Sequence, residues 1–252
     1  MSRPSAPVDG RSNRVDPYAA LMDVIRARRT VRAFAPSEIP PAHYEMILDA
    51  ARHAPSGANA QPWHYIVVTD PTVKARLGER FVREQIGRAR LGMKFPTPNY
   101  KGMMTAPGLI VVADFRFVRA FPVLNDDSAI DRRYQLNAER ILLQSIAAST
   151  MLAHLAAAAL GYAVWWVSAI GQEEIQEEFK PLLGVPDALS LIDIMCFGPP
   201  LNAPYTRWKK RLDQVMHRDR FDMANFLTDA QVDEWVTHER TRAMYRDGSR
   251  ID

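Results

Sequence analysis

Apolar residues recur at three- and four-residue intervals in two segments near the N-terminus, which is the spacing that places side chains on one face of a helix. The first segment covers residues 18–28. The second begins at the pair Pro40 and Pro41 and ends at a Pro-Ser-Gly break that starts with Pro55. Proline at a helix start and small residues after its end are typical helix boundaries. We therefore expect two amphipathic helices before the first strand.

Four short apolar runs follow, and each is bounded by turn-forming or polar residues. They cover residues 65–69, 108–113, 161–168 and 189–197. The second run lacks alternation between apolar and polar positions, as expected of a strand that is buried on both faces. Helical patterns separate the runs, and strands that alternate with helices favour an α/β or α+β sandwich.

A long segment from about Tyr134 to Leu160 predicts a helix that is apolar nearly all round, which is typical of a buried helix. No charged residue occurs between Ile141 and Gln172, and a membrane span needs only about 20 apolar residues. However, Gln, Ser, Thr and His side chains interrupt the segment, and Gly161 ends it. We therefore expect no membrane span but a buried helix, at the centre of the core or at a dimer interface.

Length and composition predict an ordinary globular protein of 252 residues, 47% of them hydrophobic. We expect a disordered lead over residues 1–16, one folded domain over 17–216 and a helical extension over 217–252, where a capping box at Thr228 begins a helix. The net charge of +3 comes from scattered basic residues, which argues against a nucleic-acid partner. The single cysteine, Cys196, lies in an apolar run, which predicts a buried thiol and suits a reducing, cytoplasmic compartment.

Several familiar active-site motifs are missing from the sequence. It has no H-E-x-x-H, no paired C-x-x-C, no G-x-S-x-G and no G-x-G-x-x-G. Their absence removes support for zinc-protease, α/β-hydrolase and Rossmann chemistry. The six histidines are scattered, whereas a metal site needs several ligands close together. We therefore expect no metal centre.

Three separated segments combine residue types that suit an anionic, planar ligand. Residues 28–32 read Arg-Arg-Thr-Val-Arg, and guanidinium groups bind phosphate well, although a solvated helix end has the same composition. Residues 55–63 form a small-residue turn that lets backbone amides approach a ligand, although Ser56 could also be a hydrolase nucleophile that lacks an obvious base. Residues 209–213 read Lys-Lys-Arg-Leu-Asp, which taken alone is an ordinary basic surface.

The combination of Arg-Arg-Thr-Val-Arg, then Ala-Pro-Ser-Gly-Ala-Asn-Ala-Gln-Pro-Trp at 54–63, then the basic segment 209–213 resembles the nitroreductase superfamily of FMN enzymes. The resemblance covers about residues 18–216. It implies an α+β, nitroreductase-like α/β sandwich in which helices flank a central sheet and the long central helix lies at the interface of a homodimer. It also implies that FMN binds at that interface.

The resemblance implies that the FMN phosphate is bound by side chains from both ends of the chain. These side chains are Arg28, Arg29, Thr30, Lys209 and Arg211. Arg32 resembles the cation beside the N1–C2=O edge of the isoalloxazine, where a fixed positive charge stabilises the reduced ring. Arg32 is therefore a candidate catalytic residue.

Two further segments resemble the parts of the family that enclose the flavin ring. The turn that packs against the flavin from the second subunit corresponds to Pro55, Ser56 and Gly57. The contacts at the ring edge correspond to Trp166, Val167 and Ser168. Ser168 is the second candidate catalytic residue, as a hydrogen-bond donor to N5, whereas the tryptophan could also be a core aromatic.

The resemblance implies a ping-pong reaction in which NADH or NADPH reduces the flavin, leaves, and is replaced by a nitroaromatic or related small aromatic substrate. A second branch, the iodotyrosine deiodinases, makes reductive dehalogenation of a halogenated phenol an alternative. That branch binds the zwitterion of an amino-acid substrate with a Glu, a Tyr four residues later and a Lys. Here Glu84 is followed at that spacing by Arg88, and Lys101 could stand for the Lys. A non-catalytic flavin-binding dimer is a further alternative. The sequence leaves the substrate and the preferred nucleotide open.

Overall fold

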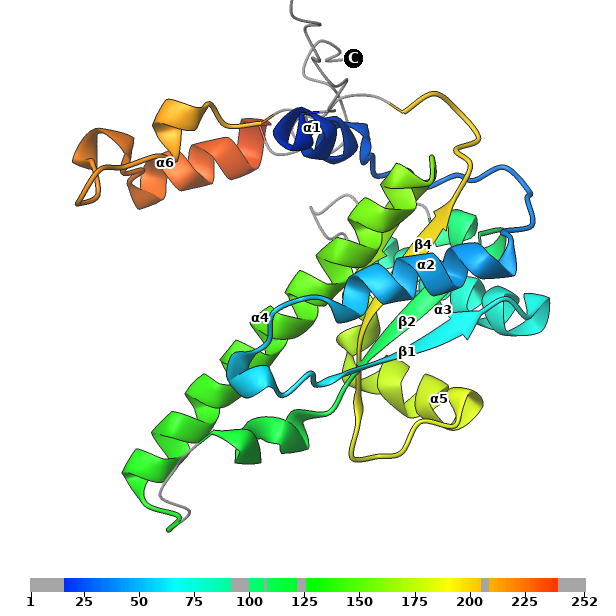
Figure 1. The fold of residues 1–252 in the computed structure, drawn as a ribbon, viewed down its shortest axis with the longest axis horizontal. Helices are drawn as coiled ribbons and strands as arrows, with labels where there is room; N and C mark the ends of the chain where they lie inside the picture. Colours follow the sequence, from blue (N-terminus) through cyan, green and yellow to red (C-terminus); the bar gives the residue numbers. More distant parts are fainter. Residues whose placement is uncertain (1–15, 92–99, 107, 122–125, 205–208, 240–252) are drawn as a thin grey trace, which may run out of the picture.

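The computed structural model describes residues 16–91, 100–106, 108–121, 126–204 and 209–239. Within these residues, an open sheet of four antiparallel strands lies against a long helix (Figure 1). The spatial order of the strands is β1 (Trp63–Val68), β2 (Gly108–Ala113), β4 (Ser190–Gly198) and β3 (Ala163–Val167). The four predicted strands are therefore confirmed, with β3 and β1 at the two edges of the sheet.

Helices cover both faces of this sheet, as the sandwich prediction requires. The α-helices of the described residues are α1 (Pro17–Ala27), α2 (Pro41–Arg52), α3 (Pro71–Arg90), α4 (Ala129–Ala159), α5 (Glu173–Leu183) and α6 (Asp229–Glu234), and α2 to α5 cover the sheet. Helices α2 and α4 pack together on one face, and α3 and α5 lie on the other (Figure 1). The α+β sandwich with a long central helix is confirmed.

Strand β4 shows how the sequence builds two cores at once. Successive side chains of a strand point to opposite faces, and the apolar run in β4 has no polar face to expose. Ile194 and Cys196 enter the core under α3 and α5, whereas Met195 and Phe197 enter the core under α2 and α4. Burial raises the pKa of the Cys196 thiol to about 12, so the predicted buried thiol is confirmed and stays protonated at neutral pH.

Helix α4 is the longest element of the described chain, with 31 residues and a length of about 46 Å. It begins at Ala129, five residues before the predicted start, because Ser128 caps it by accepting a hydrogen bond from the amide of Asp131 at 3.1 Å. Its length and composition would allow it to cross a membrane. Its side chains instead include a row buried against α2 and the sheet, which is the arrangement of a core helix.

The two ends of the chain are described only in part. Residues 1–15 of the predicted lead lie outside the described residues, and Asp16 caps α1 by accepting a hydrogen bond from the amide of Tyr18. The predicted capping box at Thr228 is confirmed, and it opens the short helix α6, which continues as a helical turn over Trp235–Glu239. Residues 240–252 lie outside the described residues, so the division into lead, domain and extension stays a prediction.

Candidate functional site

The basic segment 28–32 is held along the edge strand β3 by its backbone. The amide of Val31 donates to the carbonyl of Val164 at 3.0 Å, and the amide of Val164 donates to the carbonyl of Arg29 at 3.0 Å. Thr30 and Val164 form a parallel bridge. The basic segment and the end of β3, which the sequence assigns to two different parts of a flavin site, therefore belong to one edge of the sheet.

The side chains of Arg28, Arg29 and Thr30 are half-buried and contact one another. Arg28 Nη1 donates to Thr30 Oγ1 at 3.3 Å, and Arg29 Nη1 donates to the carbonyl of Arg28 at 3.2 Å. Guanidinium groups that are shielded from water bind an anion more strongly than exposed ones do. The structure thus brings three of the five predicted phosphate contacts together.

His154 of α4 lies close enough to Arg28 to feel its charge. Its side chain is 2% exposed, and its Nε2 is buried with no hydrogen-bond partner among the described residues. Burial, and secondarily the charge of Arg28, lowers the pKa of His154 to about 3. The imidazole is therefore neutral at physiological pH, and the positive charge at this position belongs to Arg28. Nothing in the sequence pattern distinguished His154 from the polar interruptions around it.

The Arg32 side chain lies on the side of the core under α3 and α5. Its guanidinium carbon lies 5.7 Å from the centroid of the Trp165 ring, a cation–π arrangement, and Trp165 stacks on Tyr100 at 5.5 Å. The backbone of Arg32 is fixed as well, because a Cβ placed on Gly102 would come within 2.0 Å of the Arg32 carbonyl oxygen. Arg28 and Arg32 therefore lie near side chains from different layers, and the predicted role of Arg32 beside the ring stays a prediction.

The end of β3 divides its three predicted ring-edge residues between the two faces. The Trp166 ring lies 5.2 Å from that of His154, on the α4 side, and Ser168 is exposed just beyond the strand. Val167 is buried in the core under α3 and α5, so only its backbone could contact a ligand on the α4 side. Trp166 and Ser168 share an open depression of about 450 Å³, whose other lining residues are Leu143, Ala147, Ile192 and Asp193.

The small-residue turn is anchored on α4 and is strained. The amide of Gly57 donates to Ser145 Oγ at 3.1 Å, and a Cβ on Gly57 would lie 2.3 Å from Ile141 Cγ2. Ala58 and Asn59 have φ values of 53° and 50°, which are unusual for residues with a side chain. Ser56 Oγ accepts a hydrogen bond from a later amide of the same turn. The turn is therefore held both by α4 and by a hydrogen bond within the turn itself.

This turn and the basic segment contact α4 at different levels. Ser145, which holds the turn, precedes His154, which lies near Arg28, by nine residues, or about 14 Å of helix. Within one chain, the structure therefore does not bring Pro55, Ser56 and Gly57 to the arginines of the basic segment. That separation is the one expected if each segment serves a different copy of the site.

The third predicted segment lies on an exposed part of the chain. Lys209 and Arg211 are both exposed, and the Arg211 guanidinium makes a two-point ion pair with the Asp213 carboxylate, with an Nε–Oδ1 distance of 3.0 Å. The segment leads toward α6, which extends away from the sheet in Figure 1. The predicted contact of these two side chains with a phosphate stays a prediction.

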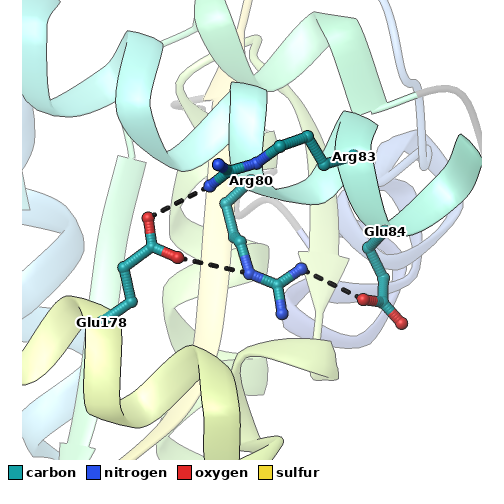
Figure 2. A network of polar contacts seen from close by, with 4 residues as sticks. All are labelled: Arg80, Arg83, Glu84 and Glu178. Carbon is teal, nitrogen blue, oxygen red and sulfur yellow. Dashed lines mark hydrogen bonds and ion pairs between the residues drawn. The ribbon is translucent and has the colours of Figure 1, made fainter. Parts of the chain in front are cut away.

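Glu84, the candidate zwitterion-reading residue, belongs to an ion-pair network that joins α3 to α5 (Figure 2). Arg80 Nη1 lies 3.0 Å from Glu84 Oε2, and Arg80 Nε lies 3.3 Å from Glu178 Oε2. Arg83 reaches the other oxygen of Glu178 at 3.3 Å. Because Arg80 is only 15% exposed, this network is partly shielded from water and holds Glu84 to its own helix. No group of three or more potential metal ligands lies together in the described part of the chain.

A comparison with known protein families identifies the family of this chain. The model of the nitroreductase family matches residues 25–199, more than half of the chain and both the basic segment and the end of β3. The chain belongs to the nitroreductase family. Members of this family are flavin-dependent oxidoreductases, so the general class of the protein is an oxidoreductase.

Individual members of the nitroreductase family show the same relationship. A protein of Archaeoglobus fulgidus, described as a candidate NADH dehydrogenase/NAD(P)H nitroreductase, is 28% identical over 179 residues, which are 71% of this chain and 84% of the relative. Mouse iodotyrosine deiodinase 1 is 28% identical over 207 residues, 77% of this chain and 67% of the relative. The structure of an FMN-dependent nitroreductase from Clostridium difficile matches with a TM-score of 0.58 at 17% identity, and the match covers 79% of this chain and 99% of that one.

The close approach of Gly102 to Arg32 gives a direct test of how Arg32 is held. We expect Gly102→Ala to lower the free energy of unfolding by about 1–3 kcal/mol, because the added Cβ would collide with the Arg32 backbone. The matched control is Gly87→Ala, where a Cβ meets nothing within 4 Å and helix propensity predicts a gain of up to about 1 kcal/mol. Urea unfolding at one fixed protein concentration measures both, and equal effects would contradict the close packing of Gly102 against Arg32.

The buried His154 predicts a pH dependence of stability. In the unfolded chain an imidazole binds a proton below about pH 6.5, whereas His154 in the folded chain stays neutral down to about pH 3. Acid therefore favours the unfolded chain, and stability is lost as pH falls from 6.5 toward 3. We expect the wild type to lose about 2 kcal/mol more than His154→Leu between pH 7 and pH 5. Denaturant unfolding checks this, with His53→Leu, at an exposed position, as the control that should keep the wild-type pH dependence.

Proposed function

We propose that this protein is an FMN-dependent oxidoreductase that reduces nitroaromatic or related small aromatic compounds with NADH or NADPH. The observation that carries the proposal is the backbone pairing of residues 29–31 with Val164, which joins the basic segment to the edge strand β3, four residues before Ser168, in a chain of the nitroreductase family. Because of this pairing, one edge of the sheet carries both a cluster of residues suited to bind an anion, at 28–30, and the exposed hydroxyl of Ser168, which lines the depression.

The residues at this edge fit the parts of FMN in their chemistry. Arg28, Arg29 and Thr30 offer half-buried donors for a phosphate, and the positive charge there belongs to the arginines because the nearby His154 is neutral. Trp166 offers an aromatic wall, and Ser168 offers a hydroxyl donor at the mouth of the depression. When bound, FMN would accept electrons from the nicotinamide and deliver them to the second substrate in a ping-pong sequence.

The protein itself would bind, orient and supply charge. Arg28, Arg29 and Thr30 would hold the phosphate, with Lys209 and Arg211 closing over it from the C-terminal segment. Arg32, fixed by its contacts with Trp165 and by Gly102, would place a cation where negative charge gathers during reduction. These roles need no protein nucleophile.

We further propose that the active form is a homodimer whose sites are shared between subunits. The turn of Pro55, Ser56 and Gly57 meets α4 about 14 Å from the level of His154, so it would serve the site of the partner rather than its own. A partner would also cover apolar side chains that α4 exposes, such as Leu143 at 47%. A cytoplasmic location and the absence of nucleic-acid and membrane partners stay predictions.

Reductive dehalogenation is the second candidate function, and the similarity to the mouse iodotyrosine deiodinase favours it. The ion pair of Glu84 with Arg80 argues against a zwitterionic halotyrosine, because the carboxylate that would read the amino group is already neutralised within the helix. A halogenated phenol without the amino-acid group needs no such contact, so it is the form of this alternative that the network leaves open.

The phosphate role of Arg28 can be tested by FMN affinity alone. We expect Arg28→Ala to weaken FMN binding about 10-fold to 150-fold, because the loss of a charge-assisted hydrogen bond costs about 1.5–3 kcal/mol. Arg26→Ala, an exposed arginine two residues earlier, is the matched control and should change the affinity less than about twofold. Fluorescence titration of the apoprotein with FMN measures both. Equal affinities of the two variants would remove Arg28 from the phosphate site.

The reaction is tested by reducing the FMN-loaded protein without oxygen and then following reoxidation of the flavin. We expect NADH or NADPH to bleach the yellow protein. We expect a nitroaromatic to restore the colour faster than buffer without substrate does. Restoration by a halophenol with halide release would instead support the dehalogenase. A coloured protein that neither nucleotide bleaches would favour a non-catalytic flavin-binding dimer, and a protein that FMN cannot reconstitute would refute the proposal. An active monomer in sedimentation would contradict the shared site.

A further inference from the structure

A β-bulge in β4 directs a carboxyl group toward α4. Val111 of β2 lies opposite Asp193, but the next residue of β2, Val112, lies opposite Leu191, so Ile192 is an extra residue in β4. Such a bulge interrupts the alternation of side chains and re-aims them. As a result, the consecutive residues Ile192 and Asp193 both line the depression on the α4 side. Without the extra residue, one of the two would point to the opposite core.

Asp193 is nearly enclosed at this position. The residue is 4% exposed, and its Oδ2 accepts a hydrogen bond from Thr150 Oγ1 of α4 at 3.4 Å. Trp166 of β3 pairs with Met195, two residues after Asp193, so the indole lies diagonally across from this carboxyl on the same face of the sheet, and its N–H is a donor to the carboxyl. Burial raises the pKa of Asp193, and the two hydrogen bonds partly oppose that shift. Burying a carboxyl group is unfavourable unless the group is hydrogen-bonded, and here it accepts hydrogen bonds from β3 and α4.

The Trp166 indole is thereby held on two sides. Its N–H, which can only donate, has Asp193 as its acceptor, and its ring lies 5.2 Å from the ring of His154. The indole is only half-buried, and its remaining surface faces the depression that also contains Ser168. The orientation of this wall of the depression therefore depends on one hydrogen bond from β4 and one ring contact from α4.

We propose that Asp193 is a positioning residue, which acts through its hydrogen bond to Trp166 to fix the indole wall beside Ser168. This proposal rests on the proposed function, because only that function places a flavin or an aromatic substrate against the Trp166 indole. Asp193 itself does not touch the reacting atoms. Its presence in an otherwise apolar strand is explained by this task, since an apolar side chain would pack against α4 but could not accept from the indole.

The hydrogen bond can be tested without any flavin. In protein labelled with ¹⁵N-tryptophan, the indole signal of Trp166 is assigned by its loss in Trp166→Phe. We expect Asp193→Leu to speed the hydrogen exchange of that indole at least about tenfold and to shift its signal, because the acceptor is gone. Trp165, whose ring lies in the opposite core, is the internal reference and should keep its signal. An unchanged Trp166 signal would overturn the proposal.

Two further variants separate this hydrogen bond from general damage. Asp193→Asn keeps an oxygen acceptor and should retain most of the protection of Trp166, whereas Thr150→Val removes the other donor to Asp193 and should leave the Trp166 indole protected. If Asp193→Leu does not fold, the pH dependence decides: the Trp166 signal of the wild type should follow a protonation that Asp193→Asn lacks. A Trp166 signal that follows the same pH dependence in both proteins would overturn the proposal.

The consequence for the site is measured with the FMN-loaded proteins. We expect Asp193→Leu to raise the KM for a nitroaromatic about tenfold while kcat changes less than about threefold, and Asp193→Asn to change either value less than about threefold. Altered indole exchange with unchanged KM would overturn the positioning role. A wild type that binds no FMN would refute the proposed function instead, and the indole measurements would still show whether Asp193 holds Trp166.

Discussion

Two backbone hydrogen bonds at the edge of the sheet determine where the candidate site can form. They join the segment 29–31 to Val164, the second residue of β3. An edge strand otherwise presents unpaired amide and carbonyl groups, so this short parallel pairing also protects the edge. The chain is tied a second time where Phe34 pairs with Pro200, after β4 ends. The arginines are consequently fixed relative to the sheet, although they belong to an irregular segment between two helices.

Polar residues of α4 carry the remaining constraints. Ser145 accepts from the amide of Gly57, Ser149 donates to the carbonyl of Ala51 at 2.9 Å, and Thr150 donates to Asp193. Each hydrogen bond reaches a different part of the fold: the strained turn, the end of α2 and the bulge of β4. The polar interruptions that argued against a membrane span are thus the side chains that connect α4 to the layers around it. A helix that was apolar throughout would bury as much surface but would fix none of these segments in register.

The sequence predicted what depends on local patterns and missed what depends on register. The apolar runs located all four strands, and the Thr228 capping box located α6, because both signals are written in adjacent residues. The start of α4 was placed too late, since its first turns are polar and only the Ser128 cap marks them. The predicted strand puts Trp165 and Trp166 on opposite faces, but which of them faces α4 could not be read from the sequence. Asp193 was visible as a charged residue in an apolar strand, but a bulge cannot be read from one sequence.

The strain in the turn after α2 is best understood together with the proposed shared site. Non-glycine residues with positive φ cost about 1–3 kcal/mol each, and Ala58, Asn59 and Gln61 all adopt that conformation. Among the described residues of its own subunit, the turn contacts α4 and Phe121 through Gly57, and it lies too far along the helix to reach Arg28. Such strain persists where the surrounding structure over-determines it and the conformation has a use. If that use is to meet the flavin of a partner, then cofactor binding and subunit association stabilise each other, because both would favour the same strained turn.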